Sequence, residues 1–190
     1  LDANPLIRKS FEEQFIIGST YSYTYDSRLE KEKRHNFYFQ GNIDLSGNLA
    51  QLVTAAIKGE SPSNENNYQL FGATFSQYVR TDLNFKYLFN IDENNQIVTR
   101  LIAGVGIPVG NSSTLPYIKQ FFIGGSNSVR AFQARTLGPG TYSISEEEQV
   151  NSLFLDQSGD LKLEGNLEYR YDIISFLKGA FFIDAANVWL

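Results

Sequence analysis

Apolar and polar residues alternate with a period of two along most of the chain. Residues 36–49 read NFYFQGNIDLSGNL, with apolar residues or glycine at every odd position and polar residues or tyrosine at every even one. Residues 160–173 read DLKLEGNLEYRYDI and repeat the alternation in the same sense. A period of two indicates a β-strand that has one apolar and one polar face.

The same alternation predicts an all-β, antiparallel, up-and-down fold without a convincing helix. The six predicted strands cover residues 12–26, 35–57, 67–90, 96–110, 159–173 and 178–190. Strands of soluble sandwiches usually run about 5–6 residues, whereas a tilted strand that crosses a membrane needs about 9–11. The lengths therefore favour a transmembrane β-barrel, with the apolar face toward lipid and the polar face toward the lumen. The alternative is a soluble sandwich whose apolar faces form the core.

Aromatic residues gather at one end of the predicted strands if the chain simply runs up and down. They are Tyr23, Tyr25, Phe37, Phe39, Tyr87, Phe89, Tyr169 and Tyr171. Such a belt is typical of a membrane–water interface, and ordinary core aromatics are the alternative. The connections at this end are 27–34, 91–95 and 174–177, whereas the other end carries 58–66 and the long 111–158. Because outer-membrane barrels have short periplasmic turns, we expect the aromatic end to be periplasmic.

Six strands are too few to close a barrel in a membrane, since such barrels begin at about eight strands. An open sheet edge in lipid would leave backbone groups without hydrogen-bond partners. We therefore expect residues 1–190 to be part of a larger barrel domain, with further strands at both ends.

Composition excludes several kinds of chemistry. The chain of 190 residues has no cysteine and a single histidine, His35, and its net charge is −5. Without cysteine there are no disulfides, thiolate metal sites or cysteine nucleophiles, and one histidine makes histidine metal sites and Ser-His-Asp catalysis improbable. A nucleic-acid surface would be basic. We therefore expect no catalytic site, no metal, no cofactor and no nucleic-acid partner, and we disfavour an outer-membrane hydrolase.

The connection 111–158 is too long for a plain turn, and loops longer than about 12–15 residues tend to be functional or disordered. Its first half contains aromatic and β-branched residues among glycines. Gly124 and Gly125 permit positive φ angles, and Gly138-Pro139-Gly140 is a turn sequence. We expect this half to fold back and pack inside the barrel.

Two carboxylates on the polar face of the last hairpin call for a cation. If the turn is centred near Phe176, Glu168 lies roughly opposite Asp184, and like charges placed opposite one another destabilise a sheet. Arg130 of the long loop could bind them, because a guanidinium matches carboxylates bidentately. Arg170 could instead neutralise Glu168 locally, and the residues alone leave both possibilities open. A catalytic carboxylate pair has no other support in the sequence.

The loop sequence FFIGGSNSVRAF, followed by LGPG, resembles the conserved sixth extracellular loop of the Omp85 superfamily, which is also called the bacterial surface antigen family and includes BamA and TamA. The family motif Val-Arg-Gly-Phe/Tyr matches Val129, Arg130, Ala131 and Phe132, after the glycines Gly124 and Gly125. GDLKLEGNLEYRYD resembles the strand that follows this loop. GAFFIDAANVW resembles the next strand, whose signature falls on Phe182, Asp184 and Ala186.

The resemblance implies a barrel of about sixteen strands, preceded by periplasmic POTRA domains that lie outside this chain together with the closing strands. It also implies that the loop enters the lumen and that Arg130 contacts Glu168 and Asp184. Alanine replaces a family glycine at Ala131 and at Ala186. If the loop glycine needs a positive φ, alanine there costs about 1 kcal/mol or more.

The resemblance further implies a non-enzymatic role in the outer membrane of a Gram-negative bacterium: assembly and insertion of β-barrel proteins, or translocation of polypeptides. The expected partners are outer-membrane lipid, unfolded client proteins and accessory assembly subunits. The alternatives are a passive pore or two-partner-secretion transporter, and an unrelated porin-like barrel. In the unrelated barrel, Arg130 would not pair with Glu168 and Asp184.

Overall fold

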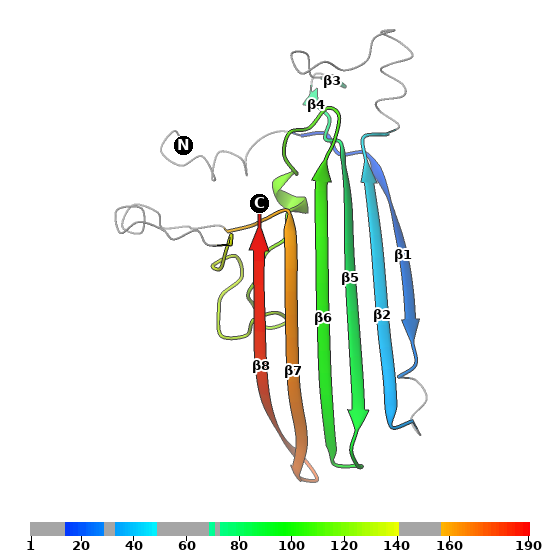
Figure 1. Ribbon diagram of the computed structural model, residues 1–190, viewed down its shortest axis with the longest axis vertical. Coiled ribbons are helices and arrows are strands. Elements are labelled where there is room, and N and C mark those ends of the chain that lie inside the picture. Colours follow the sequence, from blue (N-terminus) through cyan, green and yellow to red (C-terminus); the bar gives the residue numbers. More distant parts are fainter. Residues whose placement is uncertain (1–13, 29–32, 49–68, 71–72, 141–156) are drawn as a thin grey trace, which may run out of the picture.

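The chain forms one antiparallel sheet in which each long strand pairs with its neighbours in sequence order. The structure, a computed structural model, describes residues 14–28, 33–48, 69–70, 73–140 and 157–190. Within these residues the sheet order is β1-β2-β5-β6-β7-β8 (Figure 1). The six strands are β1 (Gly18–Asp26), β2 (His35–Ser46), β5 (Tyr78–Asn90), β6 (Asn95–Pro108), β7 (Leu161–Ile174) and β8 (Leu177–Trp189). The predicted all-β, up-and-down fold is confirmed, and its open sheet is what part of a barrel would show.

The two faces of the sheet have the chemistry that the alternation predicts. Apart from Ile174 and Leu177 beside the last turn, all five pairings join residues of equal parity, so odd positions share one face and even positions share the other. The odd face is apolar and exposed: Leu101 is 53% and Ile183 70% accessible. On the even face, Asp44 and Glu164 are buried. A soluble sandwich would bury the apolar face, so that alternative is wrong for this chain.

Strands β1 and β2 are shorter than predicted at the end opposite the aromatic residues. β1 begins at Gly18 instead of residue 12, and β2 ends at Ser46 instead of residue 57. Gly47 has a φ of +80°, and a Cβ at this position would lie 2.7 Å from the carbonyl oxygen of Ser76. The chain therefore leaves the sheet at Gly47, and residues 49–68, including the predicted connection 58–66, lie outside the described residues.

The single strand predicted over 67–90 is interrupted. Two short strands, β3 (Gln69–Leu70) and β4 (Ala73–Thr74), pair in a separate sheet, and β5 begins only at Tyr78. Between them, Phe75 forms an isolated parallel bridge with Phe15. Alternation marks extended residues but does not reveal where an extended chain changes its partner, so sequence pattern alone merged the three segments.

The predicted aromatic residues do gather on the odd face at one end of the sheet. Ring centroids lie 6.3 Å apart for Tyr23 and Phe39, 5.2 Å for Phe37 and Tyr87, and 5.7 Å for Tyr169 and Tyr171. The same end carries the connections between β1 and β2, β5 and β6, and β7 and β8, which lie at the bottom of Figure 1. Rows of aromatics therefore face outward beside the shorter connections.

The connection between β6 and β7 contains a short 3-10 helix, η1 (Tyr117–Lys119). None of the helical segments in the described ranges is both long and apolar enough to cross a membrane.

Candidate functional site

Residues 111–140 pack against the even face of the sheet, so the first half of the long loop does fold back. The backbone of Phe121 exchanges two hydrogen bonds of 2.8 Å with Gly159, just before β7. Two glycines of β6 make room for the loop. A Cβ at Gly104 would lie 2.5 Å from the Phe121 ring, and one at Gly106 would lie 2.4 Å from Leu115. Residues 141–156 of the predicted loop lie outside the described residues.

A small apolar cluster joins the loop to β8. Its buried members are Phe121, Ile123, Val129 and Val188, with Leu137 and Ala186 packed against them. Val188 and Ala186 occupy even positions of β8, where a water-filled lumen would favour polar side chains. The loop covers this part of the even face, which explains why GAFFIDAANVW has apolar residues at even as well as odd positions.

The loop turns back on itself at the two predicted glycines. Gly124 has a φ of +98° and Gly125 a φ of +91°, as the sequence predicted. A Cβ at Gly124 would lie 2.1 Å from the carbonyl oxygen of Gln133, on the returning arm of the loop. The turn therefore needs glycine for its backbone angle and for close approach, and it brings Val129 and Arg130 to the sheet.

Arg130 binds carboxylates on two adjacent strands. Its Nε and one terminal nitrogen donate to the two oxygens of Asp184 on β8, both at 2.9 Å. Its other terminal nitrogen donates to Glu168 Oε2 on β7. The backbone N–H of Arg130 also donates to Asp184, at 3.2 Å. The guanidinium carbon lies 3.6 Å from the ring centroid of Phe182. The guanidinium is therefore held by stacking on this ring as well as by its hydrogen bonds.

The charges at this site are balanced by a second arginine. Arg170 donates to Glu168 Oε1, while Arg130 occupies Oε2, so the local and the long-range pairing that the sequence left open both occur. The side chain of Asp184 is only 4% accessible and that of Glu168 15%. The hydrogen bonds with Asp184, and next those with Glu168, raise the pKa of Arg130 further above its ordinary value, although burial opposes this. Arg130 therefore remains charged.

The predicted register of the last hairpin is wrong by two residues. Asp184 stands opposite Asn166, and Glu168 stands opposite Phe182, so the carboxylates are diagonal neighbours. The pairing shifts its register between Asp172 and Ile174, and Ile174 pairs with Leu177 across the turn. This shifts the centre of the hairpin toward residue 175. Diagonal neighbours on one face still lie within reach of a long side chain, which is why Arg130 spans both.

The family follows from the sheet, the loop and the sequence match taken together. The Omp85 superfamily domain matches residues 20–190, which include all six strands except the first two residues of β1. The chain belongs to the Omp85 superfamily. Omp85 proteins are non-enzymatic factors of insertion and transport, and this membership together with the all-β sheet supports an outer-membrane β-barrel. No curated protein matches the chain.

The two alanines at positions where the resemblance predicts glycine, Ala131 and Ala186, cause no visible strain. Among the described residues, Arg135 is the only one other than glycine with a positive φ, so Ala131 does not adopt the angle that would cost energy. Ala186 packs its methyl group against the apolar cluster beside Val188. Phe132, the last residue of the motif, is 48% accessible.

Several residues that hold the loop were not predicted from the sequence. Ser128 Oγ donates to Glu164 Oε2 at 2.6 Å, and Asn166 Nδ2 donates to Asp184 Oδ1 at 2.9 Å. At the other side of the sheet, Lys119 Nζ contacts Asp44 Oδ2 on β2 at 2.6 Å. In the sequence, a polar residue at an even position indicates a side chain on the polar face. Many residues fit this description, and the sequence does not show which of them contact the loop.

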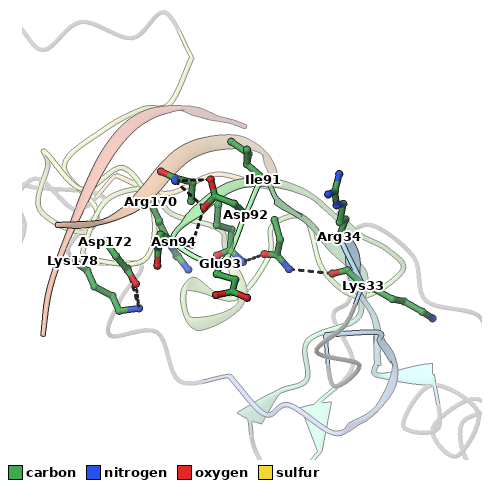
Figure 2. Close-up of a pocket in the computed structure, with 12 residues that line it drawn as sticks. Lys33, Arg34, Ile91, Asp92, Glu93, Asn94, Arg170, Asp172 and Lys178 are labelled. Carbon is green, nitrogen blue, oxygen red and sulfur yellow. Dashed lines mark hydrogen bonds and ion pairs between the residues drawn. The ribbon is translucent and has the colours of Figure 1, made fainter. Parts of the chain in front are cut away.

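A polar hollow of about 720 Å³ opens at the turn end of the sheet, away from the loop (Figure 2). Charged and amide side chains from the three connections at that end and from the adjoining strand ends line it, and several contact one another. Asp172 pairs with Lys178 at 3.1 Å, and Asn90 Nδ2 donates to the carbonyl oxygen of Lys33 at 3.1 Å. The hollow has no arrangement of nucleophile and base, so we assign it no chemistry.

The single histidine belongs to the aromatic end of the sheet. His35 Nδ1 lies 2.8 Å from the hydroxyl of Tyr87, and the His35 ring stacks on Phe89 with centroids 5.0 Å apart. In the ranges that the structure describes, no group of three or more His, Cys, Asp or Glu residues could hold a metal ion.

Proposed function

We propose that the chain is part of the barrel wall of a factor that inserts and assembles outer-membrane β-barrel proteins, or translocates polypeptides, in a Gram-negative bacterium. The observation that carries the proposal is the contact of Arg130 with Asp184 and Glu168, within a chain of the Omp85 superfamily. In this proposal the residues 111–158 form an extracellular loop that enters the lumen, and Arg130 braces it on the inner wall.

The brace has a mechanical role. Edge strands are templates for pairing with another strand, so a barrel that opens at a seam can offer its edge to an incoming client strand. The rest of the wall must keep its register while the seam opens. Arg130 links β7 to β8 through its side chain, and its backbone N–H ties the loop to Asp184. These contacts stiffen this part of the wall, because a shift of one strand along the other would break them.

The proposed partners rest on the family and on the exposed apolar surface. The exposed apolar face would contact outer-membrane lipid, in multiple crossings of the membrane, and the aromatic end would lie at the periplasmic interface. Unfolded outer-membrane proteins would be the clients, and accessory assembly subunits would act with the barrel. POTRA domains on the periplasmic side would receive the clients.

The main alternative is a passive pore or a transporter of the two-partner-secretion type. The same arginine and carboxylates support it equally well, because both kinds of protein need an ordered loop in the lumen. Depletion in the native host separates them. Loss of many different outer-membrane barrels indicates an assembly factor, whereas loss of one secreted protein, with normal levels of outer-membrane barrels, indicates a transporter. An unrelated porin is disfavoured, since it would leave Arg130 apart from the two acids.

The brace is tested by Arg130→Ala in the protein in its native membrane. We expect strongly reduced assembly or transport, measured as the level of folded client in the outer membrane. Arg28→Ala is the matched control, because Arg28 also pairs with an aspartate through two nitrogens, but in the exposed connection after β1. Full activity of Arg130→Ala at native thermal stability would contradict the proposal.

A further inference from the structure

A further carboxylate on the even face, that of Glu164, meets the loop without touching Arg130. Glu164 on β7 is 1% accessible, and its Oε2 accepts a hydrogen bond of 2.6 Å from the hydroxyl of Ser128. Lys162 Nζ lies 2.9 Å from Oε2, and a terminal nitrogen of Arg100 lies 3.9 Å from Oε1. Burying a carboxylate is costly unless cations and hydrogen bonds surround it. A solvated strand position would not need this arrangement.

Both cations around Glu164 also hold the loop backbone. Lys162 Nζ donates to the carbonyl oxygen of Phe122 at 3.0 Å, and Arg100 donates to the carbonyl oxygen of Asn127 at 2.6 Å. These carbonyls stand on either side of the glycine turn. Glu164 therefore sits at the centre of a group that grips the loop before and after Gly124 and Gly125.

Ser128 connects this group to the turn. Its hydroxyl, which donates to Glu164, also accepts the N–H of Gly124 at 3.3 Å. Its carbonyl oxygen accepts Asn166 Nδ2 at 3.3 Å, and the same amide group donates to Asp184. Ser128 lies two residues before Arg130, so its position limits where the Arg130 backbone N–H can reach Asp184.

We infer that Glu164 is a positioning residue for Arg130: through Ser128, Lys162 and Arg100 it sets the glycine turn on the wall and so places Arg130 between its two acids. The inference rests on the proposed role of Arg130 as a brace. The carboxylate is needed because it carries the charge that retains two cations, as well as an acceptor for the Ser128 hydroxyl. Glutamine preserves the size and one acceptor but not the charge.

The absence of cysteine from these residues permits a direct test by thiol labelling. Val129→Cys reports on the loop, because Val129 is 7% accessible and packs in the apolar cluster. Ser46→Cys reports on the opening of the sheet, because Ser46 on β2 is fully buried. Each reporter is placed in the complete protein in outer membranes, with and without Glu164→Gln, and the rates of reaction with a soluble maleimide are compared.

In the Glu164→Gln background we expect Val129→Cys to be labelled about tenfold faster or more. The substitution leaves Lys162 and Arg100 without their shared carboxylate, and breaking a buried charge pair shifts an equilibrium by at least that factor. Labelling at Ser46→Cys should stay unchanged. Asp172→Asn is the matched control: it removes a carboxylate from the same face of the same strand, at the exposed pair with Lys178, and should change neither rate. Ser128→Ala removes only the hydroxyl and should accelerate Val129→Cys in the same direction, even if Glu164→Gln fails to fold.

Unchanged labelling of Val129→Cys in both Glu164→Gln and Ser128→Ala would overturn the inference. So would equal acceleration at Ser46→Cys, since Glu164 would then support the whole sheet instead of the loop. The readout is independent of client assembly. If Arg130→Ala leaves assembly intact while Glu164→Gln frees the loop, the proposed function fails and the positioning role stands.

Discussion

Two cations of the loop, Arg130 and Lys119, bind the sheet in different ways. Arg130, at β7 and β8, uses three side-chain nitrogens and its backbone N–H to hold Asp184 and Glu168, and it lies over the Phe182 ring. Lys119, at the other side of the sheet, makes one ion pair of 2.6 Å with Asp44 on β2. Although burial opposes its charge, the hydrogen bonds with Asp44 and Tyr78 raise the pKa of Lys119.

The difference lies in geometry more than in charge. A guanidinium offers donors in a fixed plane, so binding two carboxylates and a ring fixes its orientation, whereas an ammonium is a point charge that can rotate. Arg130 can therefore hold β7, β8 and the loop in one register, while Lys119 only keeps the loop near β2. The two contacts attach the loop to both sides of the sheet, with unequal rigidity.

The largest expected effect is the removal of Arg130, which we compare with the removal of Lys119. Arg130→Ala leaves Asp184 buried without its main partner and should lower the free energy of unfolding by about 3 kcal/mol. Lys119→Ala should lower it by only about 1 kcal/mol, because Asp44 retains the Tyr78 hydroxyl at 3.4 Å and Lys119 is partly exposed. Urea unfolding in lipid measures both. Equal losses would remove the contrast between the two contacts.

Exchanging the two kinds of cation sharpens the comparison. Arg130→Lys keeps the charge but loses the fork and the stacking on Phe182, and we expect a loss of about 2 kcal/mol in unfolding free energy. Lys119→Arg keeps the single ion pair with Asp44 and should stay within about 0.5 kcal/mol of the parent protein. The measurement is the same unfolding titration. A harmless Arg130→Lys would show that charge alone suffices.

The two acids that bind Arg130 should differ. The Asp184 side chain is 4% accessible and accepts hydrogen bonds from two side-chain nitrogens of Arg130. We therefore expect Asp184→Asn to lower the free energy of unfolding by about 2 kcal/mol. Glu168→Gln should cost about 1 kcal/mol, because Glu168 is more accessible and shares its charge with Arg170. A larger effect for Glu168→Gln, in the same titration, would mean that Arg170 depends on Glu168 more than Arg130 depends on Asp184.

The smallest effect is expected at the motif alanine. Ala131→Gly restores the residue type of the family motif, yet Ala131 has no positive φ to relieve. The unfolding free energy should therefore change by less than about 1 kcal/mol, with a slight loss because glycine is more flexible in the unfolded chain. A clear gain in stability would show strain at this position and would reopen the question of how the loop tip is built.

Much of the fold could be predicted because alternation is a local property. The six strands, their two faces and the aromatic end all follow from residue parity, and antiparallel pairing preserved parity across the sheet. Charge on one face gave Arg130 as one of two possible partners for the acids, and the resemblance to the Omp85 superfamily implied this pairing. The contact tolerates a register error of two residues because a long side chain reaches diagonal neighbours.

What the sequence by itself determined is thus which residues are extended, which face each one occupies and which charges call for a partner. Only the tertiary structure decided where strands end, as at Gly47, and which polar side chains of the wall meet the loop, as Glu164 meets Ser128 and Asp44 meets Lys119. The reason is physical: a strand's pattern depends on neighbours two residues away, whereas these contacts join residues 36 and 75 positions apart, which become close only after the sheet has formed and the loop has folded onto it.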